Sequence, residues 1–399
     1  MSPTVKNIAV ATFLIGSVSG SFGLGFRIPN QDAAAIARAN AFVATADNPS
    51  AIYYNPAGLT QLEGVQTQIG AHILSVKSTY EGPGGFQSKT RTETAMVPQM
   101  YFSYSPEEKP YSFGLGMYVP YGLGLEWAER GSFDTLGIEG RLNYTTVSPQ
   151  LAWQVTDTLS LGAGLTLNYS EVKLRQSIPL TPNGQFKFKG IDQDVGYILG
   201  ALWQPHQQWS FGAKYRAATS MNYDGYSHAQ PISGNEATQA RLPFPQFVVG
   251  GVSYRPTPKW NFEVDIDWTD WDQLKTPIFD RSVSADVAFP FNWKSSFLYH
   301  FGVTRYLEND WWVSAGYFYS ANSTTDTNFN PLVPDTNLHV GAMGVGRKGK
   351  TWDWAVSTEI ITGPDRVVSG SNPSLFGQNA DGRYHFLNYS VNFSLGYKF

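Results

Sequence analysis

Cysteine is absent from this chain of 399 residues, and only 15% of its residues are charged. The first absence excludes disulfides, thiolate metal sites and a cysteine nucleophile, and it suits export through an oxidising periplasm. Soluble domains carry ~25% charged residues, so the low charge argues against that class. The net charge of −4 and the scattered basic residues leave no positive face for a nucleic acid, and we expect no such partner.

Long hydrophobic runs are also missing. A membrane-spanning helix needs ~20 consecutive apolar residues, and the apolar run from Ile8 to Val18 is shorter. Lys6 before this run and the small residues 19–21 after it predict a secretory signal peptide over residues 1–23. If the mature chain lies in a membrane, it must therefore cross as strands.

Alternation of apolar residues with small or polar ones begins near Val65 and continues to the end of the chain. In the final segment the outward series would be His385, Leu387, Tyr389, Val391, Phe393, Leu395, Tyr397 and Phe399. The opposite face carries Asn388, Ser390, Asn392, Ser394, Gly396 and Lys398, which do not resemble a packed core. Such a pattern is typical of a wall with lipid on one side and water or cargo on the other.

Turn signals fix the number of strands. Short polar breaks occur at Ser105–Pro110, Thr156–Thr158, Gln204–Gln208, Pro256–Pro258, Leu307–Asp310 and Lys348–Lys350. Longer connections are expected at Tyr80–Thr94, Tyr121–Gly137, Ser177–Gln185, Asn222–Gln239, Gln273–Phe291, Ala321–Asp335 and Gly363–Tyr384. Six tight turns join twelve strands, and a first and a final strand complete an even number. We predict an all-β, 14-stranded antiparallel transmembrane barrel over residues 64–399, in a bacterial outer membrane.

Tryptophans gather near the tight turns. They are Trp153, Trp203, Trp209, Trp260, Trp311, Trp312, Trp352 and Trp354. An indole has an apolar body and one N–H donor, so it prefers the boundary between hydrocarbon and water. We interpret this set as a periplasmic girdle; the alternative is a carbohydrate-binding platform.

The segment 24–63 differs from the barrel because it is rich in alanine. Gln31 to Phe42 predicts a short helix, which Asn30 or Asp32 could cap. A wall of 14 strands encloses more space than its own side chains fill, so we predict that this segment plugs the lumen as a small helical hatch. The alternative is a loose periplasmic tail.

The residues of this segment carry a resemblance. Gly25-Phe26, the run from Ala37 to Asn48, and Tyr53-Tyr54-Asn55-Pro56-Ala57-Gly58-Leu59 resemble the FadL family of outer-membrane channels, which includes TodX-type hydrocarbon channels. The resemblance implies a monomeric 14-stranded barrel with an N-terminal hatch, passive uptake of fatty acids or aromatic hydrocarbons, and sideways discharge through a kink in the third strand. It also implies an apolar contact at Phe26, to which we add Ile28.

The third predicted strand supports such a kink independently. It runs from Tyr111 to Val119 and meets Pro120 and Gly122. Proline removes a ladder donor and glycine tolerates a bulge, so pairing should fail here and leave a lateral opening at Gly114, Gly116, Pro120 and Gly122. The two inward glycines, at 114 and 116, should leave room for Asn55, Pro56 and Ala57 of the hatch. The alternative is that the strand simply ends at Pro120.

Strand parity sends several charges inward: Asp192, Asp194, Lys214, Arg216, Glu263, Asp265, Asp267, Lys294, Asp353 and Glu359. A solvated, mutually paired network is one interpretation. The other is that Lys214, Arg216 or Lys294 binds a substrate carboxylate, with Arg216 already engaged by Asp194 across the turn. Asp265, Asp267, Asp270 and Asp272 lack the turn glycine of a calcium loop, so we expect neither a metal nor another cofactor.

The sequence predicts a non-enzymatic channel for hydrophobic molecules. A sixteen-carbon tail can gain ~10 kcal/mol on burial against ~1.5–3 for one charged hydrogen bond, and long-chain fatty acids are the first expectation, aromatic hydrocarbons the alternative. His72, His300 and His339 show no spacing of a Ser-His-acid triad, which argues against a barrel-borne lipase. A general porin would not need a plug. Expected partners are outer-membrane lipid, lipopolysaccharide and, through Phe399, the barrel assembly machinery.

Overall fold

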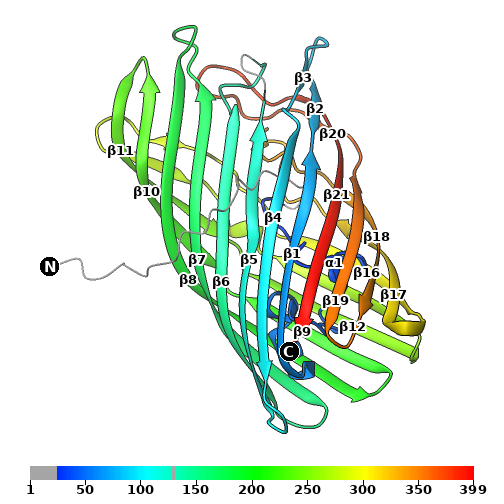
Figure 1. Ribbon diagram of the computed structural model, residues 1–399. Coiled ribbons are helices and arrows are strands. Elements are labelled where there is room, and N and C mark those ends of the chain that lie inside the picture. Colours follow the sequence, from blue (N-terminus) through cyan, green and yellow to red (C-terminus); the bar gives the residue numbers. More distant parts are fainter. Residues whose placement is uncertain (1–24, 128–130) are drawn as a thin grey trace, which may run out of the picture.

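The computed structural model describes residues 25–127 and 131–399, so the predicted signal peptide lies outside the described residues. One closed antiparallel sheet forms a tall, tilted barrel (Figure 1), and β1 (Gly64–Val76) pairs with β21 (Gly382–Lys398) to close it. The first half of the wall continues with β4 (Glu93–Ser105), β5 (Tyr111–Glu126), β6 (Glu139–Gln154), β7 (Leu159–Ser177) and β8 (Gln185–His206).

The next four wall strands are each interrupted once. They are β9 (Trp209–Arg216) with β10 (Thr219–Gln230), β11 (Ser233–Phe244) with β12 (Phe247–Thr257), β13 (Trp260–Thr269) with β14 (Ile278–Arg281), and β15 (Val287–Ala288) with β16 (Ser296–Tyr306). The wall ends with β17 (Trp311–Ser320), β18 (Leu338–Lys348), β19 (Trp352–Thr362) and β21. These segments make the predicted 14 strands. Short extensions β2 (Ser78–Glu81), β3 (Gln87–Lys89) and β20 (Arg366–Val368) stand above the wall.

All six predicted tight turns are confirmed, and they lie at the end of the barrel that holds the C-terminus (Figure 1). In outer-membrane barrels this end faces the periplasm. One predicted long loop is wrong: within Asn222–Gln239, β10 and β11 stay paired and are joined only through residues 231–232. The inner face of this hairpin is buried, but it carries Ser227, Glu236 and Thr238 beside Tyr223, so the apolar alternation that marks a strand in the sequence is weak here.

The outer face is apolar, as Leu161 and Leu165 on β7 illustrate with 45% and 52% exposure. Most of the predicted tryptophan girdle is exposed near the turns, but Trp312 is a correction, because it is buried and packs on Ala33 inside the lumen. Among the described residues no helix is long and apolar enough to cross a membrane.

The hatch segment lies inside the barrel (Figure 1) and contains α1 (Ala33–Ile36), α2 (Ala51–Tyr54) and the 3₁₀ helix η1 (Pro56–Gln61). The predicted helix Gln31–Phe42 is shorter than expected, because Ala39 and Asn40 adopt left-handed backbones (φ 54° and 61°) that reverse the chain. Of the two predicted caps, Asp32 accepts the Ala35 amide (3.2 Å). Two further 3₁₀ turns, η2 (Trp271–Gln273) and η3 (Glu308–Asp310), lie in connections of the wall.

Candidate transport site: gap, hatch and apolar pocket

A window interrupts the wall between β4 and β5. Their ladder extends only from Tyr104 opposite Phe113 to Met100 opposite Met117, and an isolated bridge joins Thr90 to Trp127 above. Between these limits, among the wall strands of the described residues, β4 pairs only with β1 and β5 only with β6, with a register shift between Tyr118 and Tyr121. Pro120 has no N–H to donate to a ladder. The alternative that the third strand ends at Pro120 is wrong, since β5 continues to Glu126.

Residues 26–28, here called the gap segment, fill this window from inside. Arg27 forms a bridge with Tyr121, the Ile28 amide donates to the Pro120 carbonyl (2.8 Å), and the Gly122 amide donates to the Phe26 carbonyl (2.8 Å). The unpaired edge of β5 is therefore satisfied by the hatch and not by a wall strand. These contacts are not part of the ladder that joins the wall strands to one another.

Arg27 ties the gap segment to the opposite wall. Its two terminal nitrogens bond both carboxylate oxygens of Asp267 on β13 (2.7 and 2.6 Å), and one of them also donates to the Thr269 hydroxyl (2.6 Å). The guanidinium lies 3.7 Å from the centre of the Phe247 ring. A buried bidentate pair of this kind fixes position as well as charge.

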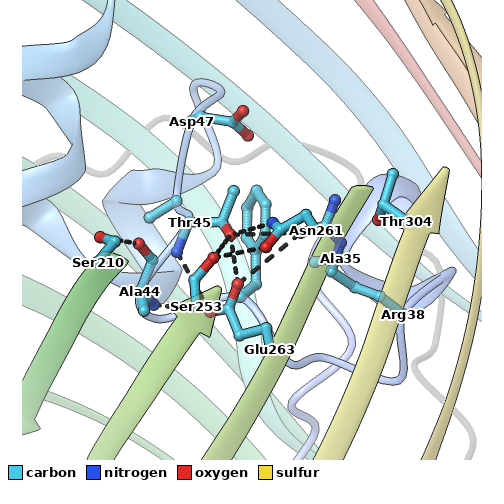
Figure 2. A network of polar contacts seen from close by, with 12 residues as sticks. Ala35, Arg38, Ala44, Thr45, Asp47, Ser210, Ser253, Asn261, Glu263 and Thr304 are labelled. Atoms are coloured by element: carbon cyan, nitrogen blue, oxygen red, sulfur yellow. Dashed lines mark hydrogen bonds and ion pairs between the residues drawn. The ribbon is translucent and has the colours of Figure 1, made fainter. Parts of the chain in front are cut away.

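The other wall acids of β13 hold the turn of the hatch at residues 42–45. Asp265 accepts the amides of Phe42 (2.8 Å) and Val43 (3.0 Å). Glu263 accepts the amides of Ala44 (2.8 Å) and Thr45 (3.2 Å) and the Thr45 hydroxyl. Figure 2 shows the part of this network around Glu263 and Thr45, in which Asn261 donates to the Thr45 hydroxyl (2.9 Å).

The expected solvated network of inward charges is therefore wrong for these acids, which bind backbone of the hatch. Glu359 on β19 also binds the hatch, but it accepts from the side-chain amide of Asn30 (2.7 Å). Within the described ranges no group of three or more His, Asp or Glu is placed to hold a metal ion. Parity alone correctly points these side chains inward, but the sequence gives no sign of their partner.

The predicted contact of Asn55, Pro56 and Ala57 with the wall occurs at different strands. A Cβ on Gly162 of β7 would collide with Pro56 and Ala57, and one on Gly200 of β8 would collide with Asn55 and Pro56. Asn55 also donates to the Ala201 carbonyl (2.9 Å).

At Gly114 and Gly116 of β5, a Cβ would instead meet Ile52, with Leu59 also close to the first of these glycines. Gly212 of β9, Gly316 of β17 and Gly344 of β18 complete a belt of wall glycines against the hatch. So close a fit leaves little space for an axial path past the hatch.

The three predicted carboxylate-binding cations do not meet at a pocket. Lys214 is buried and donates to the Tyr53 carbonyl (2.8 Å), with its ammonium 4.2 Å from the centre of the Tyr53 ring. Lys294 is a correction, because it lies exposed in the connection before β16 and not on an inward strand position.

Arg216 is buried in the wall. It donates to the hydroxyls of Tyr118 (3.0 Å) and Thr146 (3.1 Å) and to the Asn168 side-chain oxygen (3.1 Å). The expected pairing with Asp194 is wrong, because that carboxylate accepts the amides of Val195 and Ser220. The wall strand is interrupted between Arg216, where β9 ends, and Thr219, where β10 begins, and the Ser220 amide just after this interruption donates to Asp194.

An apolar pocket lies in the extracellular half of the lumen and has Phe26 in its lining. Its volume is about 690 Å³, including its open mouth. Apolar side chains from the hatch, six wall strands and three connections line it: Phe26, Leu123, Leu142, Val172, Leu174, Tyr223, Ala240, Leu242, Pro277, Phe279, Phe289, Phe291, Leu332 and Val333. Gly140, Arg141, Lys173, Arg241 and Asn330 also border it. Ile28, also predicted here, packs elsewhere, in a cluster with Val97, Val119 and Phe318.

Phe26 connects the pocket to the window. Its ring contacts Trp271 (4.8 Å between centroids) and Trp293 (5.5 Å), while its carbonyl accepts from Gly122 on β5. Sequence reasoning missed Trp271 and Trp293, because they lie in connections without periodicity. The sequence offers one sign of them: both tryptophans lie away from the tight turns, where the tryptophans of the predicted girdle are found.

Comparisons with known proteins agree with this geometry. A family model described as "Outer membrane protein transport protein (OMPP1/FadL/TodX)" matches residues 17–369. The long-chain fatty acid transport protein of Escherichia coli O6:H1 is 21% identical, over 83% of this chain and 84% of the relative. A Pseudomonas aeruginosa FadL homologue covers 94% of this chain and 100% of its own at TM-score 0.85 and 17% identity. The toluene transporter TbuX of Ralstonia pickettii covers 92% and 98% at TM-score 0.72 and 18% identity.

Proposed function

Because the chain belongs to the FadL/TodX family of outer-membrane transport proteins, which are channels for hydrophobic compounds and not enzymes, we propose that it takes up long-chain fatty acids passively. The ligand binds first in the apolar pocket at Phe26 and then leaves sideways through the window between β4 and β5. The observation that carries this proposal is the gap segment, in which one residue, Phe26, both lines the pocket and pairs with the edge of the window.

Recognition rests on the hydrocarbon tail. The pocket lining is almost entirely apolar, and Lys214 and Arg216 are already bonded inside the protein. Each buried methylene contributes ~0.8 kcal/mol, so a long tail binds without a charged clamp. The carboxylate of a fatty acid then stays at the mouth of the pocket, in water.

Sideways exit follows from the same energetics. A tail released into the periplasm would expose its methylenes to water, whereas a tail that moves through the wall stays in hydrocarbon. The belt of wall glycines packs the hatch tightly, and the window needs only the release of the gap segment. Binding of a ligand against Phe26 competes with its aromatic contacts and thereby favours that release.

Aromatic hydrocarbons are a second candidate. A lining that contains several phenylalanines suits a small neutral ring as well as a tail. The family description names TodX, and the printed names of TbuX and of Pseudomonas putida TodX call both proteins toluene transporters.

Filling the pocket tests the proposal. Ala240 lies in the pocket and Ala163 on the lipid-facing side of β7, so A240W should abolish binding and uptake while A163W, with the same added volume, should leave both intact. Both variants should retain the heat-modifiable mobility of a folded barrel. Normal uptake by a folded A240W would exclude the pocket from the route. Oleate and toluene then compete for the pocket of the unaltered barrel. The compound that displaces the other at the lower concentration belongs to the preferred class.

A further inference from the structure

Two rows of positive side chains cross the outer face of the barrel near its extracellular end. Lys173 on β7 stands directly opposite Lys189 on β8, and Arg175 stands directly opposite Lys187. The second row continues to β10, where His228 is the partner of Lys187. These side chains line one shallow groove on the outside of β7, β8 and β10.

Such an arrangement opposes folding. Side chains directly opposite on neighbouring strands are ~4.5–5.5 Å apart at Cβ, and like charges there are destabilising. Local carboxylates compensate for part of this charge, because Arg175 is ion-paired with Glu126 (2.8 Å) and with Glu139 (3.2 Å), which stands opposite it on β6. Glu171 alone serves two lysines, Lys173 at 2.8 Å and Lys189 at 3.6 Å. Within residues 25–127 and 131–399, Lys187 has no carboxylate at ion-pair distance. A ligand that carries negative charge would relieve this repulsion.

The height of the rows identifies that ligand. Below them, β7 presents Leu161, Leu165 and Tyr169 to the lipid. Lys173 follows Tyr169 by four residues, or ~13 Å along the strand. On β8, Ile191 also faces outward and is 47% exposed, and Lys189 is the next outward residue above it. The rows therefore lie immediately beyond the hydrocarbon, at the level of the lipid headgroups. On this side of an outer membrane the headgroups belong to lipopolysaccharide, whose lipid A carries phosphates.

We propose that Lys173, Lys187 and Lys189 form a binding site for the phosphate groups of lipid A on the outer face of β7 and β8. The acyl chains of the bound lipid lie along the apolar face of the same strands. The three side chains reach the phosphates from two neighbouring strands, so the site orients the barrel in the leaflet. Lys173 also borders the apolar pocket, whereas Lys187 and Lys189 line the outer groove and not that pocket, so Lys187 and Lys189 are the residues to test.

Titration of the purified full-length barrel with lipid A, followed by native mass spectrometry, tests the site. The barrel should bind lipid A with both phosphates about tenfold or more tightly than fully dephosphorylated lipid A. K187Q/K189Q should lose most of this preference. The control K109Q/K259Q removes the same charge from exposed lysines at the periplasmic turns and should keep it. Both variants are checked for heat-modifiable mobility.

Equal affinity of the barrel for the two forms of lipid A would overturn the proposal, as would a folded K187Q/K189Q that keeps the preference. Displacement of lipid A by millimolar inorganic phosphate would show a site for free phosphate and would also overturn it. Fatty-acid uptake by K187Q/K189Q is not expected to change, so the failure of this proposal can be distinguished from failure of the transport route.

Discussion

At the scale of single residues, burial decides what a charge does in this barrel. Arg27, Lys214 and Arg216 are all at most 3% exposed, and each makes hydrogen bonds within the protein. A buried charge without a partner costs several kcal/mol, so such residues hold structure together. The wall acids of β13 likewise hold the hatch, each at a different place along it.

Asp267→Asn should loosen the gap segment. The substitution leaves the buried Arg27 guanidinium without its ion pair, a loss of ~3–5 kcal/mol when one partner of a buried pair is removed. The amides of Ile28 and Gly122, which join the segment to β5, should then exchange hydrogen faster. Glu263→Gln is the matched control, because Glu263 holds residues 44 and 45 instead. If exchange at the Ile28 and Gly122 amides became equally faster in both variants, the hatch as a whole would be loosened, which would contradict a specific role of Asp267 at the gap segment.

Lys214→Met should not change the selectivity between charged and neutral ligands. Because the Lys214 ammonium binds the Tyr53 carbonyl, its loss should weaken binding of oleate and of oleyl alcohol by the same factor. The measurement is the ratio of the two dissociation constants in the variant and in the unaltered barrel. A loss of about tenfold or more for oleate alone would restore Lys214 as a carboxylate clamp.

At the scale of elements, the connection 321–337 closes the pocket from the extracellular side with Leu332 and Val333. Within it, Asp335 is buried and accepts the amide and the hydroxyl of Ser323 (both 2.7 Å). Burial raises the pKa of Asp335 to about 6. Its protonation therefore stabilises the closed connection at low pH.

The connection should open more readily as pH rises from about 4 to about 6. The folded pKa lies above the unfolded one, so the stabilisation is complete below pH 4 and is lost as pH passes the folded value. Exchange protection of the Ser323 amide, corrected for intrinsic rates, should fall by up to about a hundredfold over this range. D335N keeps a neutral acceptor and should remove the dependence. A wild-type connection with constant protection would contradict this role.

The wall was predictable from the sequence because the surroundings of each strand determine the alternation of its own side chains. Alternation along β7 or β21 reflects lipid on one face, and tight turns such as 155–158 need only local polar residues. The pocket was not predictable in this way. Trp271, Phe289 and Leu332 come from separate connections, and their meeting depends on contacts across the lumen that leave no periodic pattern.

At the scale of the whole molecule, the barrel is a rigid wall with one interruption and a hatch that fits it closely. The anchors at Asp265 and Glu263 and the glycine belt hold most of the hatch, whereas the gap segment is held mainly by Arg27 and two backbone hydrogen bonds to β5. Mobility should therefore concentrate at the window. The account requires that transport depends on the gap segment and not on displacement of the entire hatch.

Two engineered disulfides test this claim most directly, since the chain has no cysteine of its own. R27C/Y121C locks the gap segment to β5 at directly opposed residues, and T45C/S253C locks the hatch turn to β12, where the two hydroxyls lie 3.5 Å apart. Opposed positions at this spacing suit a disulfide. Oleate uptake is measured for each variant in its oxidised and its reduced form. Both forms lack the same two original side chains, so a difference in uptake between them is caused by the disulfide. We predict that oxidation stops uptake through R27C/Y121C and leaves T45C/S253C unaffected. Uptake that survives the first lock and fails with the second would contradict lateral exit and place the route through the hatch.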